Sequence, residues 1–320
     1  MSAHGLTLSS PLHKRFFAWM DERFPAANSI VVIVLYLVCS AVARYSATGG
    51  EYTLYVTDLI GAFVTWSMFL LLRVFDEHKD YELDVKNYPE RVLQSGLITL
   101  KHLKVVGALA VLCQIAWSFI LGGGIAGPLV AWLIMIIWAG LMTAEFFCGE
   151  WLEKRLTLYA LSHMAIMPLI IWWVVNLAVP GLAFDHMIGA LMTLAFVSGF
   201  CFEITRKTRG PEEERDTVDS YTKIYGVKGC SMIILALLTA MAAIQFYMIS
   251  HIVESHFITG YVLVLVFIGM AALSVLKFMK SPSLPGREKN EKMIGLSMIG
   301  GYSVVVSAVI VERGFAVAIY

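Results

Sequence analysis

Charged residues are scarce in this sequence of 320 residues: aspartate, glutamate, lysine and arginine make up 15% of it, against about 25% in soluble domains. Basic and acidic residues number 24 each, so no net charge attracts a nucleic acid. The five cysteines follow no CxxC spacing, which argues against a zinc site, a redox pair or a disulfide framework. Phosphate-binding GxxxxGKS or GxxxxGKT loops, Rossmann glycine patterns, GxSxG elbows and HExxH pairs are also missing. These absences exclude a basic nucleic-acid binder and a secreted disulfide scaffold.

Long apolar runs dominate what remains. Hydrophobic residues make up 58% of the chain, more than the core of a soluble domain can absorb. Runs of about 18–22 apolar residues are long enough to cross a bilayer as α-helices. We predict an all-α integral membrane protein with nine transmembrane helices, at residues 28–45, 52–74, 100–121, 126–145, 157–178, 185–204, 229–250, 257–277 and 293–312.

The charged residues between these runs are distributed asymmetrically. All 24 basic residues except Arg44 and Arg313 fall in the N-terminal segment or in alternate loops, on one side of the membrane. Because cytoplasmic loops carry the excess of lysine and arginine, we expect the N-terminus in the cytoplasm. Residues 1–27 then form a cytoplasmic N-terminal segment, and residues 28–320 form a single domain in the cell (inner) membrane, crossing it several times.

Two of the cytoplasmic loops are unusually acidic and resemble each other. Residues 73–96 and 203–226 have the same length and follow the second and sixth apolar runs. Each passes acidic residues, a proline and a tyrosine before ending on a glycine. The orientation of a membrane protein depends on positive charge and does not require carboxylates. A solvated linker explains one such loop, whereas two at equivalent places indicate a duplicated functional unit.

The first acidic loop carries Asp76, Asp80 and Asp84, spaced at i, i+4 and i+8. On a helix that continues the second span these carboxylates lie along one face, whereas Glu77 and Glu82 point elsewhere. Like charges at this spacing destabilise a helix unless a positive group compensates them. Magnesium is the natural candidate, because it prefers oxygen ligands and keeps waters that a substrate phosphate can replace.

The second acidic loop offers Glu212 and Asp216 at i and i+4, with Glu213 between them, after a proline suited to a first helical turn. Basic side chains accompany both clusters, which suits a magnesium-bridged diphosphate whose free oxygens the cations clamp. An alternative role for the basic pair at positions 154 and 155 is to anchor the topology. We assign diphosphate binding to Arg73, Arg91, Lys154, Arg155, Arg206 and Lys207.

The order of these features resembles the UbiA superfamily of intramembrane prenyltransferases. Members of that family have nine transmembrane helices and two aspartate-rich cytoplasmic motifs, after helices two and six. The first motif runs NDxxDxxxD and precedes a basic residue, a short apolar pair and a glycine. The similar segment here runs Asp76-Glu77-x-x-Asp80-x-x-x-Asp84, followed by Arg91-Val92-Leu93 and Gly96. In topology the resemblance covers nearly the whole chain.

The resemblance implies that residues 28–320 form a prenyltransferase-like domain, with nine helices around a central lipid-open chamber. The activity it implies is Mg²⁺-dependent transfer of a prenyl group from a prenyl diphosphate to an acceptor, expected to be aromatic or lipid-like. Asp76 and Asp80 would act catalytically through the metal, and the acceptor site is unknown, with His163 and Tyr221 as candidates. The metal ligands would be Asp76, Asp80, Asp84, Glu212, Glu213 and Asp216.

Departures from the family pattern keep two other functions open. Asp76 stands where the family has asparagine, Glu77 where it has aspartate, and Arg209 at a usually acidic position of the second motif. A terpene cyclase of the UbiA type, which ionises a prenyl diphosphate without an external acceptor, is therefore an alternative. A transporter is a second alternative, but a transporter is expected to carry ionisable residues near the bilayer midplane. The predicted spans contain almost no charge, with Asp58 close to an end.

Overall fold

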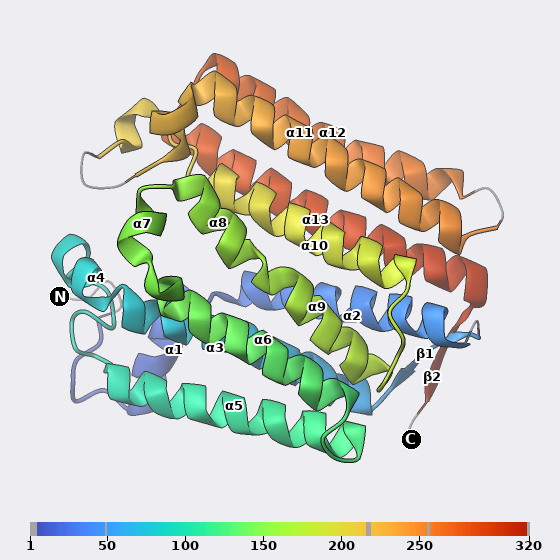
Figure 1. Cartoon of the computed structure of the whole chain (residues 1–320). Coiled ribbons are helices and arrows are strands. Elements are labelled where there is room, and N and C mark those ends of the chain that lie inside the picture. The colour runs from blue at the N-terminus through green and yellow to red at the C-terminus, as the bar shows by residue number, and fades with distance from the viewer. Residues whose placement is uncertain (1–4, 49, 216–218, 255–256, 319–320) are drawn as a thin grey trace.

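The computed structural model describes residues 5–48, 50–215, 219–254 and 257–318 (Figure 1). Two short 3-10 helices, η1 (Glu145–Phe147) and η2 (Pro211–Glu213), and two strands, β1 (Tyr52–Tyr55) and β2 (Phe315–Ala318), accompany the α-helices. The α-helices are α1 (Leu12–Arg23), α2 (Ala26–Thr48), α3 (Thr57–Lys79), α4 (Tyr81–Asn87), α5 (Leu100–Gly122), α6 (Gly127–Thr143), α7 (Gly149–Glu153), α8 (Leu156–Met164), α9 (Ile166–Ala178), α10 (His186–Arg206), α11 (Tyr221–Ile252), α12 (Ile258–Lys280) and α13 (Leu284–Arg313).

Polar side chains begin several of these helices. The Asp185 carboxylate accepts a hydrogen bond from the backbone N–H of Ile188 at the start of α10, at 2.8 Å. Ser220 and Ser283 cap α11 and α13 in the same way. Each cap satisfies a backbone donor that the first helical turn leaves unpaired. These polar caps interrupt the apolar sequence and therefore fix where the long helices start.

Each predicted span overlaps an apolar helix, and the chain is a multi-pass membrane protein. Within the part of the chain that the structure describes, eight segments are long and apolar enough to cross a bilayer. Helix α6, with 17 residues, is a shorter apolar helix in the fourth predicted span. The fifth span consists of α8 and α9, which meet at Ala165. Helices α11 and α13 extend well beyond the predicted apolar runs into polar sequence.

The second predicted span, 52–74, is wrong at its start. Residues Tyr52–Tyr55 form β1, which pairs in parallel with β2, and α3 begins only at Thr57 and continues to Lys79. Tyrosine and threonine favour extended backbone, and the C-terminal segment supplies a partner for their peptide groups. The sequence did not reveal this partner, because it lies more than 250 residues away.

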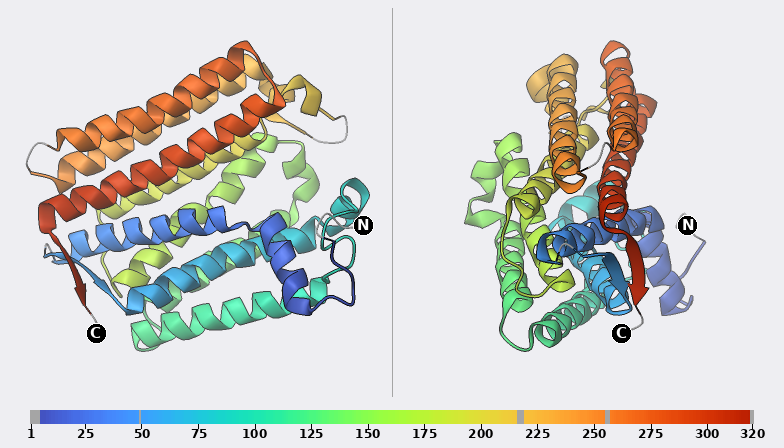
Figure 2. Two further views of the ribbon diagram at one scale, coloured as in Figure 1. Left: turned by 180° about the vertical axis from the view of Figure 1, so that it is seen from behind. Right: turned by 90° about the vertical axis from the view of Figure 1, so that its right-hand side faces the viewer.

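Helix α2 lies at the centre of the bundle and contacts α3, α9, α10 and α13. Helices α10 to α13 pack together on one side, and α3, α5 and α6 pack together on the other. Figures 1 and 2 show that α1, α4, α7 and the segment before α11 gather at one end of the bundle. The two strands lie at the opposite end, so the described termini are at opposite ends.

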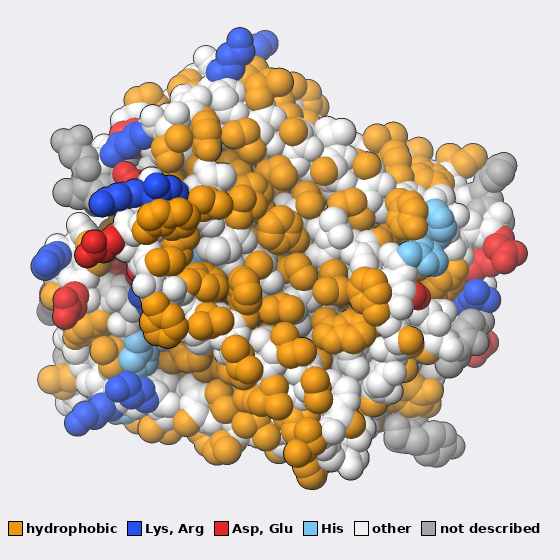
Figure 3. All heavy atoms as spheres, viewed as in Figure 1, with side chains coloured by type: hydrophobic (Ala, Val, Ile, Leu, Met, Phe, Trp, Pro, Cys, Tyr) orange, Lys and Arg blue, Asp and Glu red, His pale blue; other side chains and the backbone are white. Residues whose placement is uncertain are grey.

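The side of the bundle seen in Figure 3 is almost wholly apolar between its two ends, where the charged side chains gather. Large apolar side chains of the long helices are exposed, for example Leu112 of α5 and Ile137 of α6, which are both 61% exposed. Soluble proteins rarely expose a continuous apolar patch of this kind. The surface therefore fits contact with lipid over the length of the helices.

A buried ion pair holds the strand end together. The Arg44 guanidinium donates to both oxygens of the Asp58 carboxylate, at 2.8 and 2.9 Å. The same carboxylate accepts a hydrogen bond from the Tyr36 hydroxyl at 2.6 Å and one from the Tyr55 backbone N–H at 2.7 Å. Asp58 thereby connects α2, β1 and α3, and its side chain is almost fully buried.

Candidate active site

The carboxylates predicted at the end of the second span lie on an almost continuous helical path. Asp76 is in the last turn of α3, Asp80 separates α3 from α4, and Asp84 is in α4. The backbone N–H of Asp80 donates to the Asp76 carbonyl at 2.9 Å, and that of Asp84 donates to the Asp80 carbonyl at 2.8 Å. The predicted i, i+4, i+8 spacing along a helix is therefore present, although the side chains have different partners.

Asp76 and Asp80 keep carboxylates that other groups can reach. The Asp76 side chain is about half exposed, and its nearest cation is the Arg73 guanidinium at 3.9 Å. The Asp80 side chain makes no hydrogen bond or ion pair with any of the described residues. Burial raises the pKa of the Asp80 carboxyl above its usual value, and the positive charge of Lys79 opposes that shift. Added positive charge near these two carboxylates would favour their ionised form.

Asp84, in contrast, already has two cationic partners. The Arg91 guanidinium lies 2.8 Å from its carboxylate and the Arg23 guanidinium lies 3.3 Å from it. Arg91 also stacks on the ring of Tyr88, at 3.7 Å from the ring centroid. The predicted metal ligand Asp84 and the predicted diphosphate ligand Arg91 thus bind each other.

Glu77 is a buried anchor beneath the site. Its side chain accepts hydrogen bonds from Arg23 at 2.6 Å and from Arg73 at 2.6 Å. The residue is 1% exposed. Its spacing in the sequence predicted only that it points away from the face with the three aspartates, and did not predict this burial. Because Glu77 accepts hydrogen bonds from both arginines, it fixes Arg73 next to Asp76.

The end of α10 brings charged residues of the second acidic loop to the same region. The Glu203 carboxylate binds Arg206 at 2.7 Å and Lys207 at 2.8 Å. Arg206 also interacts electrostatically with Asp76 of α3. The starts of the two loops, far apart in the sequence, therefore meet through α3 and α10.

Tyr159 of α8 lies between the two loops. Lys79 donates a hydrogen bond to its hydroxyl, and the ring centroid is 4.9 Å from the Lys79 amine and 5.7 Å from the Lys207 amine. Lys79 also binds Glu145 at 2.7 Å. The ring of His163 stacks on Tyr159 with a centroid separation of 3.9 Å. His163, a candidate for acceptor binding, thus lies beside the charged cluster.

The segment that presents Glu145 has an unusual backbone. Glu145, Phe146 and Phe147 have φ of 50°, 54° and 57°, in the left-handed region. Each such residue costs about 1–2 kcal/mol relative to right-handed backbone. Strain of this kind gathers at functional sites, where the surrounding contacts maintain it. Here the strained turn directs Glu145 towards Lys79.

The acidic residues further along the second loop have partners of their own. Glu212 accepts a hydrogen bond from the backbone N–H of Leu284, which lowers the pKa of its carboxyl. Glu213 binds Arg287 at 2.7 Å. Both carboxylates are therefore held at the start of α13. The third predicted ligand of this loop, Asp216, lies outside the described residues.

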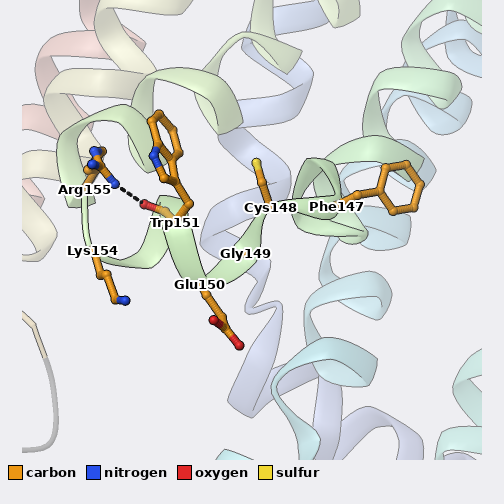
Figure 4. A pocket seen from close by; sticks show the side chains of 7 residues that line it. All are labelled: Phe147, Cys148, Gly149, Glu150, Trp151, Lys154 and Arg155. Atoms are coloured by element: carbon orange, nitrogen blue, oxygen red, sulfur yellow. Dashed lines mark hydrogen bonds between the residues drawn. The ribbon is translucent and has the colours of Figure 1, made fainter.

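Lys154 and Arg155 lie apart from the contacts described above. Figure 4 shows them beside α7, around a pocket of about 610 Å³ whose labelled side chains diverge from one another. Arg155 stacks on Trp151 at 4.2 Å from the ring centroid and donates to the Trp151 carbonyl at 3.0 Å. A cation on an exposed tryptophan is typical of a membrane interface, in keeping with the anchor alternative.

Tyr221, the other candidate for acceptor binding, is buried in the second loop's junction with α8. Its hydroxyl donates to the Leu156 carbonyl at 3.3 Å, and its backbone N–H donates to the Lys207 carbonyl at 3.1 Å. The side chain does not line the chamber described below. These contacts support the loop against α8.

An apolar chamber of about 400 Å³ opens next to Asp76. Its polar mouth consists of Arg23, Arg73, Asp76 and Glu203, from α1, α3 and α10. Below the mouth, the walls come from α2, α3, α8, α9, α10 and α13 and are almost entirely apolar. The space therefore combines a charged entrance with an interior suited to a hydrocarbon, and it matches the expected central chamber.

Three residues of this region were missed by the sequence analysis. Glu203 was taken only as the start of a loop, and Glu145 was not assigned to the site. Glu291 of α13 was not considered, although it interacts electrostatically with Arg206. A signal for Glu203 did exist, since it lies three and four residues before two basic residues on one helix. Glu145 flanks the end of the fourth apolar run, close to Glu150 and Glu153, whereas nothing local marks Glu291.

The donor set fits magnesium bound together with a substrate. Among the described residues, no group of three or more histidine, cysteine, aspartate or glutamate side chains is arranged to hold a metal by itself. Magnesium usually binds through one or two carboxylates, waters and substrate phosphates, without a complete protein cage. Two such carboxylates are those of Asp76 and Asp80, because neither forms an ion pair shorter than 3.9 Å with a described residue.

No protein-family model and no curated protein sequence matches this chain. Two solved structures are similar to it. One, of digeranylgeranylglyceryl phosphate synthase, has a TM-score of 0.58 at 17% identity and covers 94% of this chain and 99% of that one. The other, the apo structure of a UbiA homolog from Aeropyrum pernix K1, has a TM-score of 0.62 at 14% identity and covers 89% and 97%. The resemblance to the UbiA superfamily is thus confirmed in three dimensions: this chain has the fold of a UbiA homolog.

Proposed function

We propose that this protein transfers a prenyl group from a prenyl diphosphate to a small aromatic or lipid-like acceptor in the membrane, with Mg²⁺ as cofactor. The observation that carries the proposal is the apolar chamber whose mouth holds Asp76, Arg73 and Glu203. A substrate with a charged head and a hydrocarbon tail is complementary to such a space. The shared fold adds support by analogy, because one neighbour is digeranylgeranylglyceryl phosphate synthase.

In this proposal Asp76 and Asp80 hold the metal. When bound, Mg²⁺ would supply positive charge for the diphosphate that leaves. Arg73 of α3 and Arg206 of α10, which both interact with Asp76, would add to that charge. Asp84 takes a positioning role, since it holds Arg23 and Arg91. Glu212, Glu213 and Asp216 remain proposed contributors from the second loop.

The reaction would break the bond between the first prenyl carbon and the diphosphate oxygen, which keeps the electron pair. A nucleophilic atom of the acceptor then forms a bond to that carbon and loses a proton to a base or to the released diphosphate. The chamber walls exclude water from the allylic cation, which would otherwise be hydrolysed. The rings of Phe69 and Phe202 line this space and can stabilise positive charge through their faces.

Metal removal tests the proposal directly. Purified protein is incubated with geranyl, farnesyl and geranylgeranyl diphosphates and a pool of acceptors, and diphosphate release is measured with Mg²⁺ or with EDTA. We expect release with Mg²⁺ and a loss of about 100-fold or more with EDTA, because the leaving group would lack its charge partner. Calcium, which prefers more ligands at longer distances, serves as the metal control.

The acceptor arm separates the proposed activity from its alternatives. Release that requires the acceptor pool supports a transferase, whereas release without any acceptor indicates the terpene cyclase. Absence of release from all three donors, with protein that remains folded, would contradict an enzyme acting on prenyl diphosphates and favour the transporter.

We further propose that the acidic end of the bundle faces the cytoplasm, across the cell (inner) membrane. Cys148 provides a native probe, because it is exposed beside α7 at that end. Cys113 is exposed too, but it lies midway along the membrane-spanning helix α5, and Cys39, Cys201 and Cys230 are buried. A membrane-impermeant maleimide is expected to label the protein in inverted vesicles and not in right-side-out cells. Cys148→Ala, which should abolish the labelling, is the control, and labelling from intact cells would reverse the orientation.

A further inference from the structure

Two histidine side chains from different helices meet at the end of the bundle that carries the two strands. His186 is the first residue of α10, and His251 lies in the last turn of α11. Their ring centroids are 5.6 Å apart, with an angle of 62° between the ring planes. Both residues are exposed, and Figure 3 shows histidine side chains gathered at this end of the surface. The proposed reaction uses neither of them, because they lie at the far end of α10 from Glu203.

The separation of the two rings fits a shared metal ion. Zinc binds histidine nitrogens at about 2.0–2.1 Å, which places the centroids of two imidazoles on one ion roughly 5–5.5 Å apart when the nitrogen–zinc–nitrogen angle is about 109–120°. The observed distance of 5.6 Å is close to this range. Because both side chains are exposed, small rotations about their bonds can bring the two nitrogens onto one ion.

One ring nitrogen of His251 is already engaged, which leaves the other for a ligand. Its Nδ1 lies 2.8 Å from the backbone carbonyl oxygen of Tyr247, one turn earlier on α11. A carbonyl oxygen only accepts hydrogen bonds, so Nδ1 carries the proton and Nε2 keeps its lone pair. Histidines that bind metals usually donate their other ring N–H to a carbonyl or carboxylate in this way. His251 therefore has the tautomer that a metal ligand requires.

Neighbouring groups hold the two rings in place. The Tyr247 ring lies 4.1 Å from the His251 ring and 6.3 Å from the His186 ring, measured between centroids. The Tyr45 hydroxyl of α2 donates a hydrogen bond to the His251 carbonyl at 2.6 Å, which fixes the end of α11. Ligands that are already positioned lose less conformational freedom when an ion binds.

The helix ends around the pair also favour a cation. His251 is in the last turn of α11, where the helix dipole is negative. The first turn of α10 has the opposite sign, but the Asp185 carboxylate that caps it lies next to His186 in the chain and offsets that charge. Glu254, three residues after His251, adds a second carboxylate, whereas the basic residue Arg313 at this end stacks on an aromatic ring.

We propose that His186 and His251 form a binding site for a divalent transition metal, with Zn²⁺ as the simplest occupant. Among the described residues, no third histidine, cysteine or carboxylate joins them as a ligand group, so waters would complete the coordination. Imidazole suits zinc, copper and nickel, whereas magnesium prefers oxygen ligands. The site is therefore chemically separate from the carboxylates of the candidate active site, and it does not depend on the proposed reaction. A bound ion would join α10 to α11 at the end opposite Glu203.

A zinc titration tests this site. Protein purified without a histidine tag is titrated with ZnCl₂ in a calorimeter, with excess Mg²⁺ present to occupy sites that prefer oxygen ligands. We expect one zinc ion per chain and a dissociation constant that rises about 10-fold or more in His186→Ala and in His251→Ala, because each variant keeps a single imidazole. His102→Ala on α5 is the matched control, since its Nδ1 already accepts a hydrogen bond from the Thr99 backbone N–H, and it should keep the wild-type constant.

Copper supplies a spectroscopic readout that a merely structural role would not move. Cu²⁺ binds imidazole more tightly than Zn²⁺ does, and its electron paramagnetic resonance spectrum should show coupling to two imidazole nitrogens in wild type and to one in each variant. His186→Gln and His251→Gln, which also lack an imidazole, take the place of an alanine variant that does not fold. A wild-type chain that binds no zinc below about 100 µM, or single variants that bind zinc as tightly as wild type, overturns the proposal. A two-nitrogen copper spectrum in both variants overturns it as well.

Discussion

Replacing Asp76 or Asp80 by asparagine is expected to lower magnesium-dependent diphosphate release about 100-fold or more. Both changes keep the size of the side chain and remove the negative charge that would hold the metal. Asp76 is half exposed at the chamber mouth, and Asp80 has no ion-pair partner among the described residues, so neither is needed to neutralise a buried arginine. Release is measured over a magnesium titration, in which the half-saturating concentration should also rise.

Two further variants make this result specific. Glu82→Gln removes an exposed carboxylate from α4 nearby and should leave release within roughly 2-fold of wild type. Asp84→Asn should lower release without shifting the half-saturating magnesium concentration, because Arg23 and Arg91 already engage its carboxylate. Equal shifts for Asp76→Asn and Asp84→Asn would instead restore Asp84 as a metal ligand.

At the opposite end of the bundle, Asp58→Ala is expected to lower the free energy of unfolding by about 3–5 kcal/mol. The change leaves the buried Arg44 guanidinium without its carboxylate and removes the acceptor of the Tyr36 hydroxyl and the Tyr55 N–H. The measurement is equilibrium unfolding in mixed micelles, followed by reaction of the buried Cys39 thiol with a fluorogenic maleimide in protein whose other four cysteines are replaced by alanine.

The matched control is Glu51→Ala, which removes an exposed carboxylate near the same strand and should change the unfolding free energy by less than about 0.5 kcal/mol. The double variant Arg44→Met with Asp58→Leu should recover most of the stability, since replacing both partners leaves no unpaired charge. If Asp58→Ala unfolds like wild type, the ion pair contributes nothing to the bundle.

Much of the candidate site was predictable, because some of its signals are local in the sequence. Helical spacing placed Asp76 and Asp80 along one helical path, and the similar length of the two loops indicated that they act together. The sequence did not predict the partners of these carboxylates. Whether Asp84 meets a metal or Arg91 depends on the path of the segment after α4, which carries Arg91, and nothing in the spacing of the aspartates determines that path.

The same limit applies to the chamber. Glu145 reaches Lys79 through a left-handed turn, and Gly199 meets Met164 across two helices; no pattern within one segment encodes either contact. Helix packing decides which faces enclose a space and which face lipid. In a membrane both kinds of face are apolar, so hydrophobicity does not distinguish them.

By itself, the sequence determined that the chain is a helical membrane protein, where its spans lie and which end carries the charged chemistry. These properties follow from the length of apolar runs, which must satisfy their backbone hydrogen bonds as helices in lipid. Tertiary structure alone decided that β1 pairs with the C-terminal strand, that Asp84 binds arginines, and that a chamber opens below Asp76. The strand pairing, the contact of Asp84 with Arg23 and the chamber walls all join residues far apart in the chain, which only the packed bundle brings together.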